Sequence, residues 1–229
     1  MFTYHLQYPR INYPIYEGKI LTPDVKNEKE FNVDTYVLPT THSGFPEFPG
    51  APYIPAAVSA MWLSLVLNSA QVRRRLLNSV NFLDVWPTDH SLNQELDNNN
   101  INTISLWDIW QYIQFKYPFV ILKKITTWNQ IIVAVAEGLT VMVGGSIYES
   151  FTNSFSSGVV PMPKPGEGLL GGHIFNVVSL NLRDQTARLA GNLGPMFGKN
   201  GLLYVRTSYL RNIDINRDFF VLTAESRVS

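Results

Sequence analysis

Apolar residues recur at different spacings along the chain, and the change in spacing divides it into regions. Prolines are spread through residues 1–55 and deny hydrogen-bond donors to a continuous helix or central strand, so this stretch is expected to be extended and irregular. Helical spacing then runs from Pro55 to about Leu77, where apolar residues cover most faces of the predicted helix. Because a helix that is apolar nearly all round belongs inside a globule, we expect this first helix to be buried. A second helix is predicted through residues 105–115, with Thr103 as a candidate cap.

Strand-like patterning begins after one further helix. That helix is predicted over residues 126–138, capped by Thr126 or Thr127 and ended by Gly138. Strand-like runs follow at 139–151, 173–181, 186–190 and 201–207. Because the helices come first and the strands later, the pattern indicates an α+β fold and not alternating βαβ units.

Composition limits the classes of protein and of partner. The 229 residues suffice for one large domain or two small lobes that share a cleft. The 18 basic residues balance the 18 acidic ones, so no nucleic-acid partner is expected. The chain has no cysteine, which excludes disulfides, thiolate metal sites and thiol nucleophiles built from its own residues.

Membrane and cofactor signals are also lacking in the sequence. The N-terminus does not have the basic and apolar regions of a signal peptide, and we expect an intracellular or virion location. The most apolar stretch, 56–70, is shorter than the roughly 20 residues of a membrane span, so we expect no such span. We expect neither a metal nor a cofactor, because no glycine pattern matches a nucleotide fingerprint and the histidines are scattered. These are His5, His42, His90 and His173.

Four stretches within residues 126–221 and just beyond carry a family resemblance. They are TTWNQIIVAVAEGLTVMVGGSIYESF, GVVPMPKPGEGLLGGHIFNVVSLN, GNLGPMFGKNGLLYVRTSYL and RDFFVL. In this order they resemble the papain-like (C1) cysteine peptidases, and most closely the bacterial and viral members without elaborate disulfides. The first is similar to a helix, glycine-ended turn and strand of that family. The second resembles the segment of the catalytic histidine, the third the NSWG..WG..GY segment, and the fourth the final strand.

The resemblance implies one papain-like domain over residues 1–229, in which a helical lobe faces a twisted antiparallel β lobe. After the proline-rich lead-in of residues 1–55, residues 56–125 would form the mainly helical lobe and residues 126–229 the mainly β lobe. In this family the nucleophile begins the long buried helix of the first lobe, the histidine lies on the second, and substrate binds in the groove between them.

The catalytic residues that the resemblance implies are matched at one position. His173 takes the place of the catalytic base. The nucleophile position falls near Ala56, within one or two residues, and the position of the oxyanion glutamine falls near Gly50. The orienting asparagine aligns without a gap to Gly191, whereas a one-residue bulge would place Asn192 there. The neighbours of Ala56 offer no nucleophile either: they are Pro55, Ala57 and Val58.

These substitutions predict a catalytically inactive protein in which His173 is a relic. Such a protein would serve as a structural or protein-binding subunit of a larger assembly, with a virion or capsid component as the more specific hypothesis. The cysteine-free, asparagine-rich composition is similar to that of proteins from large DNA viruses. Three alternatives remain: an active hydrolase whose cysteine was replaced by alanine, a serine hydrolase that uses Ser59, and a carbohydrate- or peptide-binding module. The proline-rich lead-in is expected to strap across the lobes.

Overall fold

The computed structural model describes residues 14–18, 30–32, 60, 61, 63–65, 68, 106–190 and 197–224, and all structural statements concern these residues. Its main element is a twisted antiparallel sheet with the strand order β2-β7-β3-β4-β5-β6, and β1 pairs with β4 beside this path. The strands are β1 (Glu30–Asn32), β2 (Val120–Ile125), β3 (Val141–Tyr148), β4 (Leu169–Asn181), β5 (Thr186–Ala190), β6 (Leu202–Arg206) and β7 (Asn216–Ala224).

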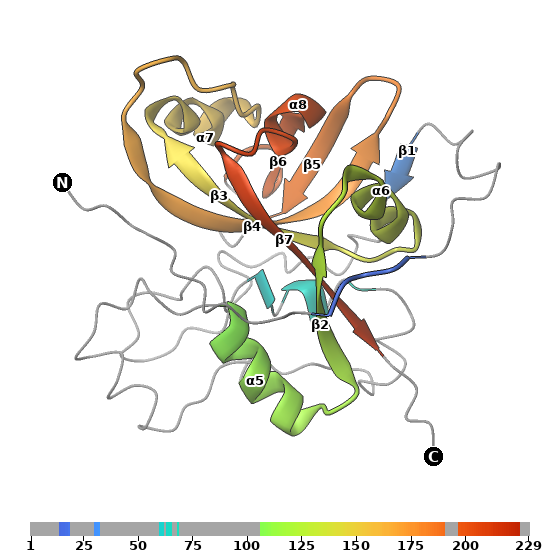
Figure 1. Cartoon of the computed structure of the whole chain (residues 1–229). Coiled ribbons are helices and arrows are strands. Elements are labelled where there is room, and N and C mark those ends of the chain that lie inside the picture. Colours follow the sequence, from blue (N-terminus) through green and yellow to red (C-terminus); the bar gives the residue numbers. More distant parts are fainter. Residues whose placement is uncertain are drawn as a thin grey trace, which may run out of the picture.

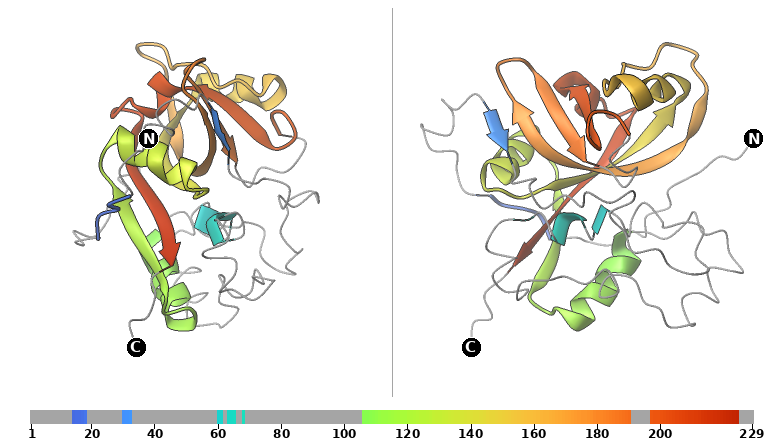
Figure 2. Two further views of the ribbon diagram at one scale, coloured as in Figure 1. Left: turned by 90° about the vertical axis from the view of Figure 1, so that its right-hand side faces the viewer. Right: turned by 180° about the vertical axis from the view of Figure 1, so that it is seen from behind.

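Short helices connect and cover the strands. They are α5 (Leu106–Lys116), α6 (Trp128–Ala136), the 3-10 helix η3 (Glu149–Asn153), α7 (Ser154–Ser157) and α8 (Thr207–Leu210). Figures 1 and 2 show α5 at the end of the molecule opposite to α7 and α8, with the fragments of residues 60–68 between α5 and the body of the sheet. None of the helices within the described ranges has the length and apolar character that a bilayer crossing would require.

The caps predicted for the helix at 126–138 are confirmed. Thr127 is the N-cap of α6 and forms a capping box with Gln130: the Gln130 backbone N–H donates to the Thr127 hydroxyl at 3.3 Å, and the Thr127 N–H donates to Gln130 Oε1 at 3.0 Å. The helix ends before Gly138, whose φ of 77° is left-handed. The local sequence therefore determines both ends of this helix.

Most strands lie where the sequence predicts them. The strand at 186–190 is observed with those bounds, while β4 begins at Leu169, four residues before the predicted start. The run 139–151 ends as a strand at Tyr148 because η3 follows it directly. Strand β2 was not predicted, since Lys123 and Lys124 interrupt its apolar alternation. Lysines are common on outer strands of sheets, and β2 is the outer strand here.

Both ends of the sheet are covered by irregular segments of the same chain. Ile15 forms a parallel bridge with Lys124 of β2, and Val159 forms a parallel bridge with Tyr204 of β6. At the β6 end, the Val160 N–H donates to the Tyr204 carbonyl at 2.8 Å. These contacts satisfy backbone groups that an outer strand would otherwise expose to other chains.

Candidate functional site around His173

The structure describes one of the residues that sequence analysis assigned to the catalytic site. His173 lies on β4, and its backbone pairs with Gly145 of β3. Ala56, Gly50, Gly191 and Asn192 lie outside the described residues, as does the alternative nucleophile Ser59. The candidate site therefore comprises the surroundings of His173 and the described residues between 60 and 68.

The imidazole of His173 packs against other aromatic rings. The residue is half-buried, and its Nε2 atom is buried. Its ring centroid lies 4.4 Å from that of Phe175, the next residue on the same face of β4, with an interplanar angle of 59°. Close aromatic pairs of this kind stabilise a fold beyond the burial of their area. His173 thus has a packing role that does not depend on catalysis.

Phe175 continues the contact into a larger aromatic cluster. Its ring lies 5.7 Å from Phe151 of η3, and Phe151 lies 6.4 Å from Phe197. Phe155 of α7 completes the group at 4.6 Å from Phe197. We call these five rings, His173 included, the aromatic cluster. It joins β4 to η3 and α7, and the histidine ring packs against this group through Phe175.

A glycine separates His173 from the buried Asn216. Gly145 pairs with His173 on one side and with Asn216 of β7 on the other. A Cβ atom at Gly145 would lie 2.5 Å from Asn216 Oδ1, so the glycine is required by the close approach of that amide. Asn216 donates through Nδ2 to the Tyr209 carbonyl at 2.6 Å. Because neighbouring strands are about 4.8 Å apart, its backbone is about 10 Å from that of His173.

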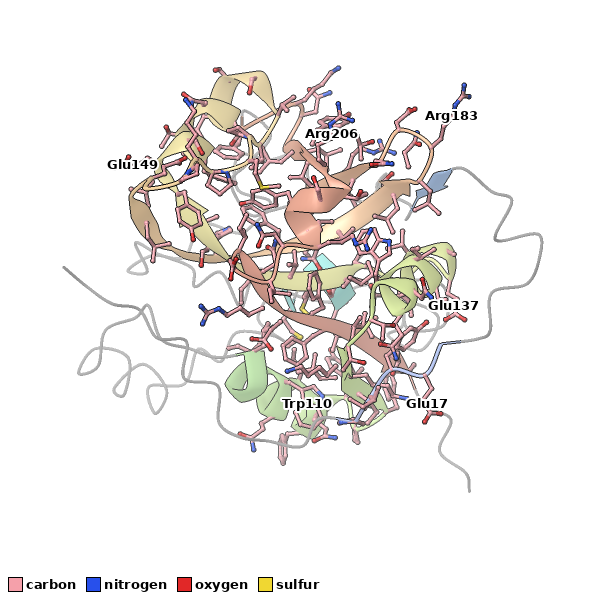
Figure 3. The ribbon with its side chains drawn as sticks, turned by 45° about the horizontal axis from the view of Figure 1, so that its top comes forward. Glu17, Trp110, Glu137, Glu149, Arg183 and Arg206 are labelled. Atoms are coloured by element: carbon pink, nitrogen blue, oxygen red, sulfur yellow. The ribbon has the colours of Figure 1, made fainter. Side chains whose placement is uncertain are left out.

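The start of β4 is held in place by a glutamate. Glu167 accepts hydrogen bonds from the Ser150 N–H and, at 2.8 Å, from the Lys164 N–H. Hydrogen bonding from Ser150 and from the Lys164 backbone holds the pKa of Glu167 below its usual value. Glu149, which Figure 3 labels, donates its backbone N–H to the Gly168 carbonyl at 3.1 Å. These bonds tie the loop before β4 to η3 and thereby set the position of the strand that carries His173.

A buried polar network joins the other end of β4 to the segment of residues 60–68. Asn176 accepts from the Ser64 hydroxyl at 2.7 Å and donates through Nδ2 to the Ala60 carbonyl at 3.1 Å. Both side chains are fully buried. One amide therefore binds two successive turns of the segment, and buried polar groups satisfied in this way specify a single arrangement.

Asn68 joins the same segment to the sheet through its own side-chain amide. It donates through Nδ2 to the Leu222 carbonyl at 2.7 Å and accepts from the Thr140 N–H at 2.9 Å and the Thr140 hydroxyl at 2.8 Å. The hydroxyl oxygens of Thr140 and Ser64 lie 2.9 Å apart, which links the two asparagines into one group. We call Ser64, Asn68, Thr140 and Asn176 the polar joint. It connects residues 64 and 68, which follow the predicted nucleophile position, with Thr140 directly before β3, with β4 and with the Leu222 carbonyl of β7.

Sequence analysis did not find the polar joint or Asn216. Ser64 and Asn68 interrupt an apolar run, and Asn176 interrupts the apolar core of β4, but a single sequence does not show which interruption faces a partner. Among the described residues, no group of three or more His, Asp or Glu side chains is placed to hold a metal ion. The described site thus consists of the packed His173, the row His173–Gly145–Asn216 across three neighbouring strands, and the polar joint, whose side chains are hydrogen-bonded to one another.

The antiparallel β lobe, bonded through the polar joint to residues 64 and 68, belongs to a papain-like fold. The structure superimposes on xylellain, a cysteine protease from Xylella fastidiosa, with a TM-score of 0.68 over 93% of this chain and 92% of that one, at 13% sequence identity. The predicted α+β class and the resemblance to papain-like cysteine peptidases are thereby confirmed.

The other similar proteins match a smaller part of the chain. The chain is 29% identical over 91 residues to an uncharacterized peptidase C1-like protein of Acanthamoeba polyphaga mimivirus. That match covers 39% of this chain and spans 29% of the length of the viral protein. A procathepsin B of Trypanosoma congolense aligns over 47% of this chain with a TM-score of 0.37 and 16% identity. No family model matches the sequence.

Proposed function

We propose that this chain is a catalytically inactive papain-like protein that acts as a structural or protein-binding subunit. The observation that carries the proposal is the combination of a papain-like fold with a sequence of 229 residues that contains no cysteine. Peptidases with this fold act through a thiolate, and a chain without any thiol has no such nucleophile.

The remaining catalytic positions support the same conclusion. Near the nucleophile position stands Ala56, near the oxyanion donor Gly50, and at the ungapped position of the orienting asparagine Gly191. Catalytic groups that act as a unit lose their effect together, so a retained His173 does not preserve the reaction. The packing of His173 into the aromatic cluster gives that residue a reason to persist without catalysis.

The partner is best sought among proteins. Basic and acidic residues are balanced, so the chain has no general electrostatic attraction for a polyanion. The polar joint and the aromatic cluster both maintain the scaffold around the former reaction centre, which suits a surface kept for binding. The asparagine-rich composition and the similarity to a mimivirus protein support a virion-associated role as the more specific form of the proposal.

Restoring the thiol tests the inactivity. Ala56→Cys and Ala57→Cys should both react with an electrophilic peptide probe no faster than an ordinary, unactivated thiol and should release no product from a mixed peptide library, provided that thermal melting shows a folded protein. The unaltered chain and Ser59→Ala serve as matched controls for a serine-dependent reaction. Turnover by either cysteine variant would establish the alternative of an enzyme that lost one residue, and turnover abolished by Ser59→Ala would establish a serine hydrolase.

Cross-linking mass spectrometry of the protein from its natural source tests the structural role. Defined neighbours at a fixed stoichiometry, in particular other particle proteins, are expected. A monomer that cross-links to nothing in intact particles or cells would refute the structural proposal and leave the carbohydrate- or peptide-binding alternative, which a binding screen of the groove would then test.

A further inference from the structure

We propose that residues 14–18 form a permanent clasp on the β lobe, which holds the outer strand β2 and the helix α6 together and detaches only with local unfolding of both. We call these residues the N-terminal clasp. This inference is independent of the proposed function, because it concerns how the β lobe is kept closed and not what the protein binds.

The backbone of the clasp extends the sheet beyond β2. The Lys124 N–H donates to the Pro14 carbonyl at 2.8 Å, and the Tyr16 N–H donates to the Lys124 carbonyl at 2.9 Å. The clasp therefore bonds both the backbone N–H and the carbonyl of Lys124, while the opposite edge of β2 pairs with β7. The two bonds cover part of a strand edge that would otherwise be open to pairing with another chain.

Tyr16 anchors the clasp by its side chain. It is 4% exposed, and its hydroxyl donates to Glu137 Oε2, at the end of α6, at 2.5 Å. Burial, together with the Glu137 carboxylate, raises the pKa of Tyr16 above its usual value, so the phenol stays protonated and keeps donating. Ile15, by contrast, is 45% exposed. The attachment therefore alternates along the clasp, as expected for a strand with one face buried.

Gln130 couples the clasp to the start of α6. Its Oε1 atom accepts from the backbone N–H groups of Thr126 at 2.8 Å and Thr127 at 3.0 Å, which forms part of the helix cap. Its Nε2 atom donates to the Tyr16 carbonyl at 2.5 Å. The same amide thus caps the helix and holds the clasp, so loss of the clasp removes one of the contacts that orient the cap.

Gly18 permits the clasp to lie directly on α6. A Cβ atom at this position would be 2.7 Å from Val133 Cγ1 and 2.9 Å from the Tyr16 ring. Figure 3 shows Glu17 and Glu137 on the same side of the molecule, where the clasp passes beside α6. Farther along the chain, β1 pairs with residues 179–181 of β4, so the lead-in has a second attachment to the same lobe.

Cleavage of the intact chain tests whether the clasp is permanent. A specific protease site is introduced at residues 23–26, between the clasp and β1, and the folded full-length protein is cut and passed through a sizing column in non-denaturing buffer. The N-terminal piece should elute with the remainder of the chain. Tyr16→Ala and Gly18→Val should release it, whereas Ile15→Ala, the matched control with an exposed side chain, should not.

Hydrogen exchange of the uncut protein gives an independent readout if the protease site prevents folding. Tyr16→Ala should raise amide exchange in β2 and α6 by about tenfold or more and leave β5 and β6 unchanged, because local opening follows cooperative units. Separation of the wild-type piece after cleavage would overturn the proposal. So would equal release by Ile15→Ala, or a rise in exchange that is uniform across the sheet.

Discussion

The two halves of β4 have opposite kinds of surroundings. Residues 169–173 are exposed or half-buried and carry His173, the residue that sequence analysis matched to a catalytic histidine, whereas residues 174–180 are all buried and carry Asn176. His173 makes its described ring contact with one phenylalanine, while the Asn176 amide is bonded at both its oxygen and its nitrogen to the segment of residues 60–68.

The comparison separates what a papain-like scaffold needs from what its reaction needs. Burial of an amide without partners costs free energy, so the polar joint persists as a complete set or is replaced as a whole. A catalytic group has no such dependence once its nucleophile is absent. In this chain the polar joint is complete, whereas the sequence offers no thiol for the chemistry of a cysteine peptidase.

The largest effect is expected from the polar joint. Asn68→Leu would deprive the buried Leu222 carbonyl and Thr140 N–H of this partner, while the Thr140 hydroxyl keeps its contact with Ser64. At about 1–3 kcal/mol for each unsatisfied group, the free energy of unfolding should fall by roughly 2–6 kcal/mol. Urea denaturation measures it, with the exposed Asn153→Ala as control. A loss below about 1 kcal/mol would mean that the joint does not hold the fold together.

Gly145→Ala should have the next largest effect. The added methyl group would lie 2.5 Å from Asn216 Oδ1 and 3.2 Å from the Ile215 carbonyl oxygen, so the amide or the strand must move. Overpacking of this kind costs about 1–3 kcal/mol. A double-mutant cycle with Asn216→Ser checks the cause: the alanine should cost less when the amide is absent. Equal costs in both backgrounds would assign the effect to the backbone instead.

A smaller, pH-dependent effect is expected at Glu167. Its pKa is lowered in the folded state, so its contribution to stability is present above the unfolded value near 4.3 and is lost as the pH falls through the folded pKa. Glu167→Gln should therefore lower the melting temperature at pH 7 and converge with the wild type as the pH falls through the lowered folded pKa. The exposed Asp214→Asn controls for removal of one surface charge. A difference that persists unchanged at low pH would contradict the role of the charge.

The fold was predictable where local chemistry and resemblance agree. The capping box of α6 follows from Thr127 and Gln130 at their spacing, and β5 follows from a regular run between turn residues. β2 was missed because the lysines of an outer strand obscure its alternation, and β1 and α8 are too short to give a pattern. Periodicity detects long elements with one buried face and fails for short or outer ones.

Sequence analysis proposed one of the described residues of the candidate site and did not indicate the polar joint. His173 was proposed because glycines and an apolar run surround it in a motif that resembles the family's, and its catalytic assignment stays a prediction. The polar joint depends on partners that lie between 72 and 154 positions apart in the chain, as for Asn68 with Thr140 and with Leu222. Nothing in the local sequence of either partner records such a pairing, so only the folded arrangement reveals it.

The smallest effect is expected at His173 itself, and it distinguishes a relic from a working residue. His173→Phe keeps an aromatic ring against Phe175 while it removes both ring nitrogens, so the free energy of unfolding should change by less than about 1 kcal/mol. His173→Ala should cost more, because it also removes the ring contact. Urea denaturation of the two variants gives the comparison. If phenylalanine proved as damaging as alanine, the imidazole nitrogens would carry the role, and the histidine would have to be counted with the polar joint and not with the aromatic cluster.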